Sequence, residues 1–506
     1  FNLRGDAINT SGEIRRAEAG NVFGGGTRSQ IAITMLIKNS EKAGQACQIH
    51  YHDIGDYLSR EQKLDIVQQF GGIGAIPWQT ITPNAEQDWI NQRDPAFDRF
   101  LPMGDKANPS ALSIFDTYSN GVKSNRDAWV YNFDRLSVKN NMSRMLNFYA
   151  EQVASYKKAT DGKPKDMWPD VEKFANNDPK RISWNRSLKN DLGRLTERPY
   201  RESAIVPAMY RPFCKQWLYF DRALNDMVYQ MPKLFPKPGM ENTVIAVKGI
   251  GANRAFSALA SNVVVDLEMI SKGQVFPFYY YEPLSENDTM FVEGEVVDGF
   301  VRREAISDKV LTAFRKQYDN TLTKRDIFAY VYGVLHSTEY KSRFDIDLKK
   351  VLPRIPFAAD FWAFSRAGQK LLDLHLGYET VEPFELGGTT AQLGLDPKAD
   401  NHVVKMRFAK KGKVEDRTAI VVNKQTTLTG IPEEAYGYEV NGKPAIEWIM
   451  EKYQLDQDKV SGIENDPNTW SDDPAYIVNL VKRIVRVSME TMKIVKAMPP
   501  LNERKA

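Results

Sequence analysis

A short stretch near the start of the chain carries the side chains whose types and order point most directly to chemistry. Phe23 is followed by the glycines Gly24–Gly26 and then, after a few polar residues, by the apolar run Ile31–Ile37. An aromatic face can replace the stacking contacts that a nucleobase loses when it leaves a duplex, and glycines let such a group approach the backbone. The alternative is a core phenylalanine at a strand entrance, followed by a plain turn. Arg28 adds a charge that could meet a phosphate or stay solvated.

Residues 210–220 form a second stretch of interest, because basic and aromatic side chains alternate around a predicted tight turn between two strands. Such a mixture suits a surface that grips phosphates and packs against bases. A hairpin whose aromatic side chains simply fill a core is the alternative, and we prefer it for Trp217 and Phe220. We predict that Arg211 and Lys215, which lie near the turn, contact DNA.

Two loops later in the chain carry side chains that can read base edges. The loop from Lys248 to Arg254 superficially resembles a dinucleotide-binding fingerprint, but Arg254 stands where the third glycine should be and no helix with an acidic partner follows. Lys248, Asn253 and Arg254 are of types that can read guanine and adenine edges in the major groove. The second loop offers Lys272 and Gln274. For each loop a purely structural turn is the alternative.

Other catalytic patterns are missing or have simpler explanations. The sequence contains no Asn/Asp-Pro-Pro-Tyr/Phe tetrapeptide, no phenylalanine-and-glycine cofactor loop near the start, no P-loop and no serine-nucleophile motif. The similar string Asp473–Tyr476 opens a predicted amphipathic helix, where Asp473 is placed to cap it. His50, His52 and Asp53 have no third clear ligand of the kind that a metal site needs, so we predict no metal.

Composition gives bounds on the class of protein. The chain has 506 residues, 42% hydrophobic and 26% charged, which is ordinary for two to four globular domains. No apolar run approaches the roughly 20 residues that cross a bilayer, and the start has no signal-peptide pattern, so we expect a cytoplasmic protein without a membrane partner. Two distant cysteines fit neither a disulfide framework nor a zinc cluster. A net charge of only +3 means that any nucleic-acid surface must be local.

Periodicity places these residues on predicted elements. The first ~80 residues are typical of an α/β sheet edge, with near-continuous apolar strands that suit a sheet covered on both faces and a helix opened by a capping box from Ser59 to Gln62. The predicted strands of this part are Phe1–Arg4, Ile31–Ile37 and Cys47–Tyr51. Residues 84–133 are irregular, and strands dominate 203–282 and 401–437. The predicted helices are Asp134–Lys158, Ser307–Tyr318, Asp326–His336, Phe361–Leu376 and Pro474–Met498.

A series of motifs in fixed order resembles one family closely, the C-terminal part of Type ISP restriction-modification enzymes, and the resemblance covers almost the whole chain. These enzymes join a nuclease, an ATP-driven DNA motor, an adenine methyltransferase and a target-recognition domain in one polypeptide. The motifs are Asn2–Asp6, Thr10–Glu13, Gly26–Ile33, Tyr51–Arg60, Tyr210–Phe213, Tyr229–Lys233, Gly273–Tyr281, Asp326–His336 and Leu352–Phe357. Their order is more specific than any one of them.

The resemblance implies a fold and a domain layout. Residues 1–83 would be an α/β fragment, the last strands of a Rossmann-like sheet at the C-terminal end of an N6-adenine methyltransferase domain. An α+β target-recognition domain with helical segments would follow over 84–395, and a small strand-rich segment with a C-terminal helix over 396–506. The chain is therefore expected to open in the middle of a fold, and its first residue, Phe1, agrees with this expectation.

The resemblance also implies function, partners and cofactors. Phe23 would stack on the flipped adenine, and the recognition domain and methyltransferase would hold double-stranded DNA from two sides. The expected partners are DNA and the upstream methyltransferase, motor and nuclease domains of the parent enzyme, with the chain itself monomeric. We expect no cofactor in this chain, while S-adenosylmethionine, ATP and Mg²⁺ are implied for the parent. Two alternatives remain: one part of a split adenine methyltransferase completed in trans, or a structural coupling module without its own DNA affinity.

Overall fold

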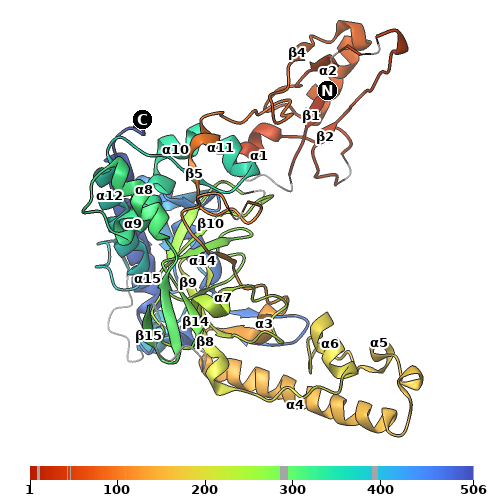
Figure 1. The fold of residues 1–506 in the computed structure, drawn as a ribbon, viewed down its shortest axis with the longest axis vertical. Coiled ribbons are helices and arrows are strands. Elements are labelled where there is room, and N and C mark those ends of the chain that lie inside the picture. The colour runs from red at the N-terminus through yellow and green to blue at the C-terminus, as the bar shows by residue number, and fades with distance from the viewer. Residues whose placement is uncertain are drawn as a thin grey trace.

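A computed structural model describes residues 1–7, 12–24, 26–42, 44–45, 47–108, 110–252, 254–284, 294–389 and 397–504 of the protein. The fold is mixed α/β, with several small sheets and helices packed into a central body (Figure 1). Two parts stand away from this body on the same side of the molecule in Figure 1, the N-terminal segment and a helical arm that contains α4. No helix in the described ranges is long and apolar enough to cross a membrane.

The N-terminal segment is built from two antiparallel strand pairs and a helix. Its strand pairs are β1 (Asn2–Arg4) with β2 (Ile31–Ala32) and β3 (Ile49–Tyr51) with β4 (Gln79–Ile81). The helix α2 (Arg60–Phe70) begins with the predicted capping box between Ser59 and Gln62. A short helix, α1 (Gly12–Glu18), precedes it. The small core of this segment consists of Leu3, Val22 and Ile54.

The predicted strand Ile31–Ile37 is wrong over most of its length. The strand ends at Ala32, and the apolar side chains that follow point into solvent, with Met35 61%, Leu36 86% and Ile37 84% exposed. The prediction assumed that an apolar run needs a sheet covered on both faces. Backbone pairing ends at Ile33, whose N–H donates to the carbonyl oxygen of Phe1 at 2.9 Å, and no described strand pairs with the residues that follow. A Rossmann-like parallel sheet is therefore not confirmed for residues 1–83.

Two four-stranded sheets form the centre of the body. The first, all antiparallel, has the order β11-β10-β13-β6, with bounds Ala258–Ser261, Val244–Val247, Gln274–Pro277 and Ser119–Asn120. The second has the order β12-β8-β9-β7, with bounds Val264–Val265, Ile205–Arg211, Cys214–Tyr219 and Tyr131–Asn132. β8 and β9 form the predicted hairpin, and Phe213 in its turn has the left-handed φ of 56°.

Smaller sheets lie around these two. A three-stranded sheet contains β14 (Tyr279–Pro283), β15 (Glu295–Val297) and β16 (Phe300–Glu304), and a four-stranded sheet contains β18 (Gly387–Thr389), β19 (Arg407–Lys411), β20 (Val414–Val421) and β21 (Thr427–Thr429). Three further sheets have two strands each. They are β5 (Leu101–Pro102) with β17 (Arg354–Ile355), β22 (Glu439–Val440) with β23 (Lys443–Pro444), and β24 (Asp456–Gln457) with β25 (Glu464–Asn465).

All five predicted helices beyond residue 133 are present, with ends within a few residues of the prediction. They are α4 (Arg135–Thr160), α8 (Asp308–Gln317), α9 (Lys324–His336), α12 (Phe361–Leu376) and α15 (Tyr476–Lys496). The shorter helices are α3 (Asp127–Val130), α5 (Val171–Phe174), α6 (Arg186–Gly193), α7 (Met231–Leu234), α10 (Thr338–Arg343), α11 (Asp345–Lys350), α13 (Pro397–Asn401) and α14 (Ala445–Lys452).

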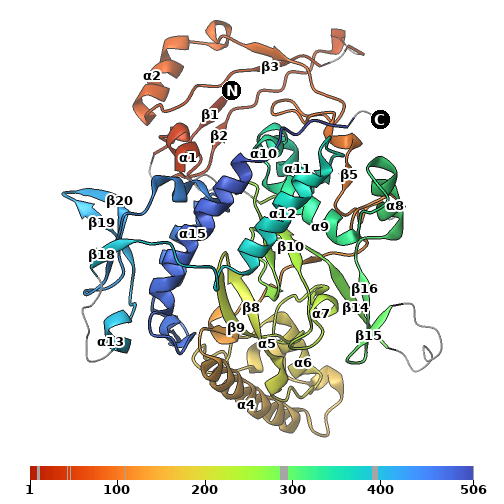
Figure 2. The same ribbon diagram turned by 90° about the vertical axis from the view of Figure 1, so that its left-hand side faces the viewer.

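Helices α12 and α15 lie on one side of the body, as Figure 2 shows. α9 and α12 approach so closely that a Cβ atom added to Gly368 would lie 1.8 Å from the carbonyl oxygen of Ala329. Only a glycine permits this backbone contact. The pair is therefore joined by direct backbone packing as well as by side chains.

The larger of two main hydrophobic cores extends across much of the chain, and the other is formed largely around α9 and α12. The larger core contains Tyr131 and Leu218 from the first half and also Ile420, Ile449 and Ile484 from the last fifth. The division at 395/396 stays a prediction, but this shared core means that residues 396–506 do not bury their apolar side chains separately from the preceding part.

Candidate nucleic-acid interface

The two loops predicted to read base edges come together in the structure. β10 pairs with both β11 and β13, with Val247 opposite Ala258 and Gln274, so the loops that follow β10 and precede β13 leave the same edge of the sheet. The backbone N–H of Gly249 donates to the carbonyl oxygen of Ser271 at 3.0 Å. Lys272 Nζ donates to the carbonyl oxygen of Gly251 at 2.9 Å.

The predicted side chains of these loops differ in exposure. Lys248 is buried, with 2% of its surface exposed, and its Nζ donates to the carbonyl oxygen of Arg254 at 3.1 Å. Burial lowers the pKa of Lys248. Lys248 therefore holds the loop closed, while Arg254 and Lys272 are exposed and Gln274 is half-buried. Asn253 lies outside the described residues.

Asn441, which the sequence analysis did not single out, fixes both loops from the C-terminal part of the chain. Its backbone N–H donates to Ser257 Oγ at 2.8 Å, its Nδ2 donates to the carbonyl oxygen of Met269 at 3.1 Å, and its Oδ1 accepts from the N–H of Ser271 at 3.1 Å. Asn441 is 3% exposed and sits in the turn between β22 and β23, with a φ of 56°. The dipeptide Asn-Gly signals such a turn in the sequence, but nothing local indicates what the turn touches.

Arg211 lies in a buried polar network beneath the β8–β9 hairpin. Its Nη1 donates to Asp266 Oδ1 at 2.7 Å, and its guanidinium lies 3.8 Å from the ring centroid of Tyr210. Tyr131 Oη donates to the other carboxylate oxygen of Asp266 at 3.0 Å. Burial raises the pKa of Asp266 to about 7, and the Arg211 charge opposes that rise. Arg211 is already engaged inside the protein by Asp266 and Asp127, and its predicted DNA contact stays a prediction that this geometry does not favour.

Lys215 is similarly engaged. Its Nζ lies 2.6 Å from Glu379 Oε2, and 13% of its side chain is exposed. Glu379 also accepts a hydrogen bond from Tyr476 Oη at 2.6 Å, which ties the hairpin to α15. The predicted contact of Lys215 with DNA stays a prediction. Trp217 packs against Trp470 with ring centroids 5.8 Å apart, in agreement with the core role that we preferred.

Phe23 stands on an ordered turn with its ring in solvent. The side chain is 68% exposed, so it is not a core residue of this chain. Asn21 fixes the turn: its Oδ1 accepts from the N–H of Phe23 at 3.0 Å and its Nδ2 donates to the carbonyl oxygen of Ser29 at 2.7 Å. Gly24 has a φ of 61°. Arg28 is exposed, and its Nη2 donates to the carbonyl oxygen of Ala7 at 3.3 Å. The turn thus presents an exposed aromatic ring beside a glycine, whose backbone leaves room for a base to approach.

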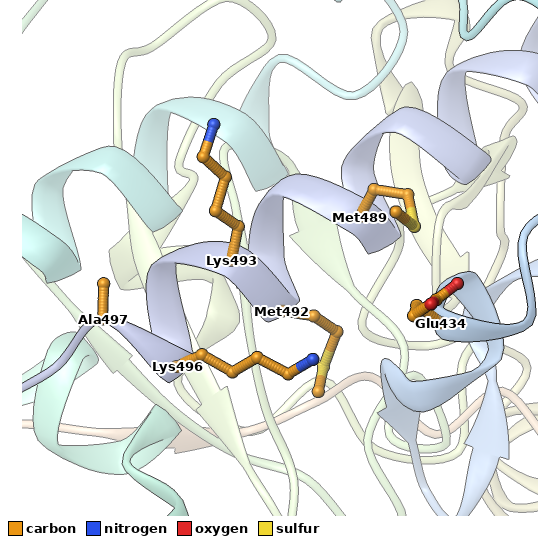
Figure 3. A pocket seen from close by; sticks show the side chains of 6 residues that line it. All are labelled: Glu434, Met489, Met492, Lys493, Lys496 and Ala497. Carbon is orange, nitrogen blue, oxygen red and sulfur yellow. The ribbon is translucent and has the colours of Figure 1, made fainter.

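No group of His, Cys, Asp and Glu side chains in the described ranges could hold a metal ion. A shallow hollow on α15 is lined by Met489, Met492 and Ala497, with Lys493, Lys496 and Glu434 around them (Figure 3). It has no arrangement of nucleophile and base, so it can pack against another surface but does not suggest a reaction.

The family model of the Type ISP C-terminal specificity domain matches residues 113–480. This chain therefore belongs to the family of Type ISP C-terminal specificity domains, as its motifs predicted. No curated protein matches the chain.

Solved structures extend the similarity to almost the full chain. A nuclease-deletion mutant of the Type ISP restriction-modification enzyme LlaGI in complex with a DNA substrate mimic is 37% identical, with a TM-score of 0.83, over 100% of this chain and 37% of that chain. The ATP-dependent Type ISP restriction-modification enzyme LlaBIII bound to DNA is 33% identical, with a TM-score of 0.84, over 99% of this chain and 31% of that chain. The DrdV–DNA complex is 29% identical, with a TM-score of 0.81, over 100% of this chain and 47% of that chain. This chain spans less than half the length of each.

Proposed function

We propose that this chain recognises a sequence in double-stranded DNA as the specificity part of a Type ISP restriction-modification enzyme. The observation that carries the proposal is the similarity along the whole chain to LlaGI and LlaBIII, whose structures contain a DNA substrate mimic and DNA. Exposed Arg254 and Lys272, on loops joined by hydrogen bonds at one sheet edge, supply donors for base edges or phosphates. The buried side chain of Asn441 holds the loop that precedes β13 in place through hydrogen bonds to the backbone of Met269 and Ser271, and its N–H donates to Ser257 Oγ.

The finer part of the proposal concerns residues 1–83, which we assign to the end of an N6-adenine methyltransferase domain. The exposed ring of Phe23 and the exposed apolar side chains Met35–Ile37 support this assignment. An exposed apolar stretch of this kind is typical of a site that another surface covers. A preceding part of the methyltransferase sheet would cover Met35–Ile37, and an extruded adenine would cover Phe23.

The described residues of 1–83 do not fit S-adenosylmethionine. The strand pairs β1–β2 and β3–β4 are antiparallel, and a single parallel bridge joins Asn2 to Asp53. The described residues after these strands form no glycine-rich loop that opens a helix, the arrangement that binds such cofactors at a helix N-terminus. We therefore assign S-adenosylmethionine, ATP and Mg²⁺ to other domains of a longer enzyme. No step of a reaction is assigned to this chain alone.

The exposed stretch Met35–Ile37 also suits a second candidate function, one part of a split methyltransferase that is completed in trans. Both candidates need a covering partner, and they differ only in whether it is covalently joined. Adding the separately expressed preceding segment, with labelled cofactor, distinguishes them by whether methyl transfer appears without a covalent link. The remaining alternative, a coupling module without DNA affinity, would not bind duplex DNA, so a measurement of DNA binding by the chain distinguishes it from the other two.

Selection of duplexes from a random-sequence pool tests the proposed function. The 506-residue chain is expected to enrich a common sequence over several rounds, and to bind the enriched duplex more tightly than the starting pool. Enrichment of no common sequence, with equal affinity for selected and unselected duplexes, would refute sequence recognition by this chain. No measurable affinity at low salt would favour the coupling module instead.

A further inference from the structure

Positive charge is distributed unevenly along the chain. Residues 135–201 contain 15 Lys and Arg but only eight Asp and Glu, whereas the whole chain contains 68 and 65. The rest of the chain therefore has fewer basic than acidic residues. These 67 residues, which we call the basic arm, coincide with α4, α5, α6 and their connections, the part that projects from the lower end of the body in Figures 1 and 2.

The basic arm is a rigid structure rather than a loose extension. One face of α4 is buried and includes Met145, Tyr149, Val153 and Tyr156. α6 packs against α4, and Tyr156 contacts Phe174 of α5 with ring centroids 4.9 Å apart. Tyr149 Oη donates to the carbonyl oxygen of Thr196 at 2.8 Å, and Tyr156 Oη to that of Pro169 at 2.6 Å. These bonds fix the returning chain against α4, so the backbone positions that carry the outer side chains keep a constant arrangement.

Most of the basic side chains on the arm have no acidic partner. Six of the 15 form ion pairs, as between Arg181 and Glu151 or Arg198 and Asp191. The remaining nine are exposed and, within the described part of the chain, form no ion pair. They are Arg144, Lys157, Lys158, Lys163, Lys165, Lys173, Lys180, Arg186 and Arg194.

Local stability explains only a few of these nine charges. Lys157 and Lys158 lie in the last turn of α4, where a cation is favourable, and Lys163 Nζ donates to the carbonyl oxygen of Ala159 at 2.9 Å. Arg186, in contrast, is the first residue of α6, where the helix dipole disfavours a cation. Unpaired like charges on one arm repel one another, so an external anionic partner is the simplest reason to keep them.

We propose that the basic arm binds the sugar-phosphate backbone of duplex DNA beside the sequence that the loops read. The 26 residues of α4 extend about 39 Å at about 1.5 Å per residue, which is longer than one turn of B-DNA, about 34 Å. The arm also projects on the same side of the body as the N-terminal segment (Figure 1). This inference rests on the proposed function and adds a sequence-independent contact to it.

A matched pair of variants tests the arm. The arm variant K157Q/K158Q/K165Q/K173Q removes four exposed, unpaired charges without touching a buried side chain. The control variant K370Q/K413Q/K424Q/K459Q removes the same net charge from exposed lysines in other parts of the chain. Both are made in the 506-residue chain, and their circular dichroism and melting temperature must match those of the unaltered chain.

The measurement is affinity for an unselected random-sequence duplex pool over a series of salt concentrations. Each lost phosphate contact should reduce the slope of log K against log salt concentration by about 0.9. The arm variant is expected to lose about one to four such contacts and to weaken equally for selected and unselected duplexes, while the control keeps the original slope. An arm variant whose slope and affinity equal those of the control would overturn the proposal, and would point to an acidic protein surface as the arm's partner.

This outcome is separable from that of the proposed function. If the unaltered chain enriches no sequence but the arm variant still lowers the salt slope, sequence recognition fails and the arm proposal stands. If the chain enriches a sequence and the arm variant binds as the control does, the arm proposal fails and sequence recognition stands.

Discussion

At the scale of single residues, the exposure of Phe23 distinguishes a structural from a functional use of an aromatic side chain. A core phenylalanine stabilises the fold, whereas a ring that is 68% exposed on a turn tied by Asn21 contributes little to stability until something stacks on it. A base contributes about 1–3 kcal/mol through such stacking. The exposed position therefore makes Phe23 a residue whose removal should affect function more than folding.

We predict that Phe23→Ala in the full-length parent enzyme impairs methylation far more than DNA binding, because stacking exists only after the adenine has left the duplex. Methylation rates and duplex affinities of the variant and the unaltered enzyme provide the measurement. The deficit should shrink when the target adenine is mismatched, because less base-pairing energy must then be overcome. A normal methylation rate would show that the ring has no such role.

We predict that Arg254→Ala, or Asn253→Ala, lowers the preference for the selected duplex over the random pool by roughly 1–3 kcal/mol if that side chain makes a bidentate contact with a base. The comparison is with Lys215→Ala, since Lys215 is held by Glu379 rather than presented by a loop. Affinities for both duplexes at one salt concentration measure the preference. An equal loss for the selected and random duplexes would make the altered side chain a phosphate contact.

At the scale of elements, α9 and α12 pack backbone against backbone, and Gly333 of α9 and Gly368 of α12 allow this close approach. We predict that Gly368→Ala destabilises the chain by roughly 1–3 kcal/mol or more, because the added methyl group would lie 1.8 Å from the Ala329 carbonyl oxygen and force the helices apart. Urea unfolding measures the change. The control is Gly74→Ala, whose methyl group would meet no atom within 4 Å. Equal midpoints for the two variants would contradict the close packing.

At the scale of the whole molecule, a buried histidine pair couples stability to pH. His375 Nδ1 lies 2.7 Å from Tyr332 Oη and its Nε2 lies 2.9 Å from Thr491 Oγ1, which joins α9, α12 and α15. Burial lowers the pKa of His336 to about 3 and lowers that of His375 as well. Below the ordinary histidine pKa of about 6.5, these two histidines are protonated in the unfolded chain but stay neutral in the folded chain.

The free energy of unfolding is therefore predicted to fall as pH decreases from about 6.5 towards about 3. Urea midpoints across this range measure the effect. His336→Gln should reduce the dependence on pH even if it also lowers stability, whereas His50→Gln, at an exposed position, should leave the dependence unchanged. A pH dependence that is identical in the His336 variant and in the unaltered chain would show that other groups cause it.

The sequence by itself determined the family, the helices and the two loops. Capping boxes at Ser59 and Thr323 and the apolar periodicity of α4, α12 and α15 are local signals, because they depend on residues three or four positions apart. The order of the motifs identified the family without any contact. The positions of the loops around Arg254 and Lys272 followed from the breaks between strands.

Only the tertiary structure decided which charges are exposed. Arg211, Lys215 and Lys248 belong to the same residue types as Arg254 and Lys272, but the first three are largely buried and held by Asp266, Glu379 and a loop carbonyl group. Arg254 and Lys272 stay exposed, although Lys272 also donates to the carbonyl oxygen of Gly251. The partners of the first three are distant in the chain or depend on how a loop closes, so no spacing rule reveals them. Asn441 reaches Ser271 across 170 residues for the same reason. The apolar run Ile31–Ile37 also needed the tertiary structure. Its composition predicted a strand covered on both faces, but the described fold contains no surface that covers it.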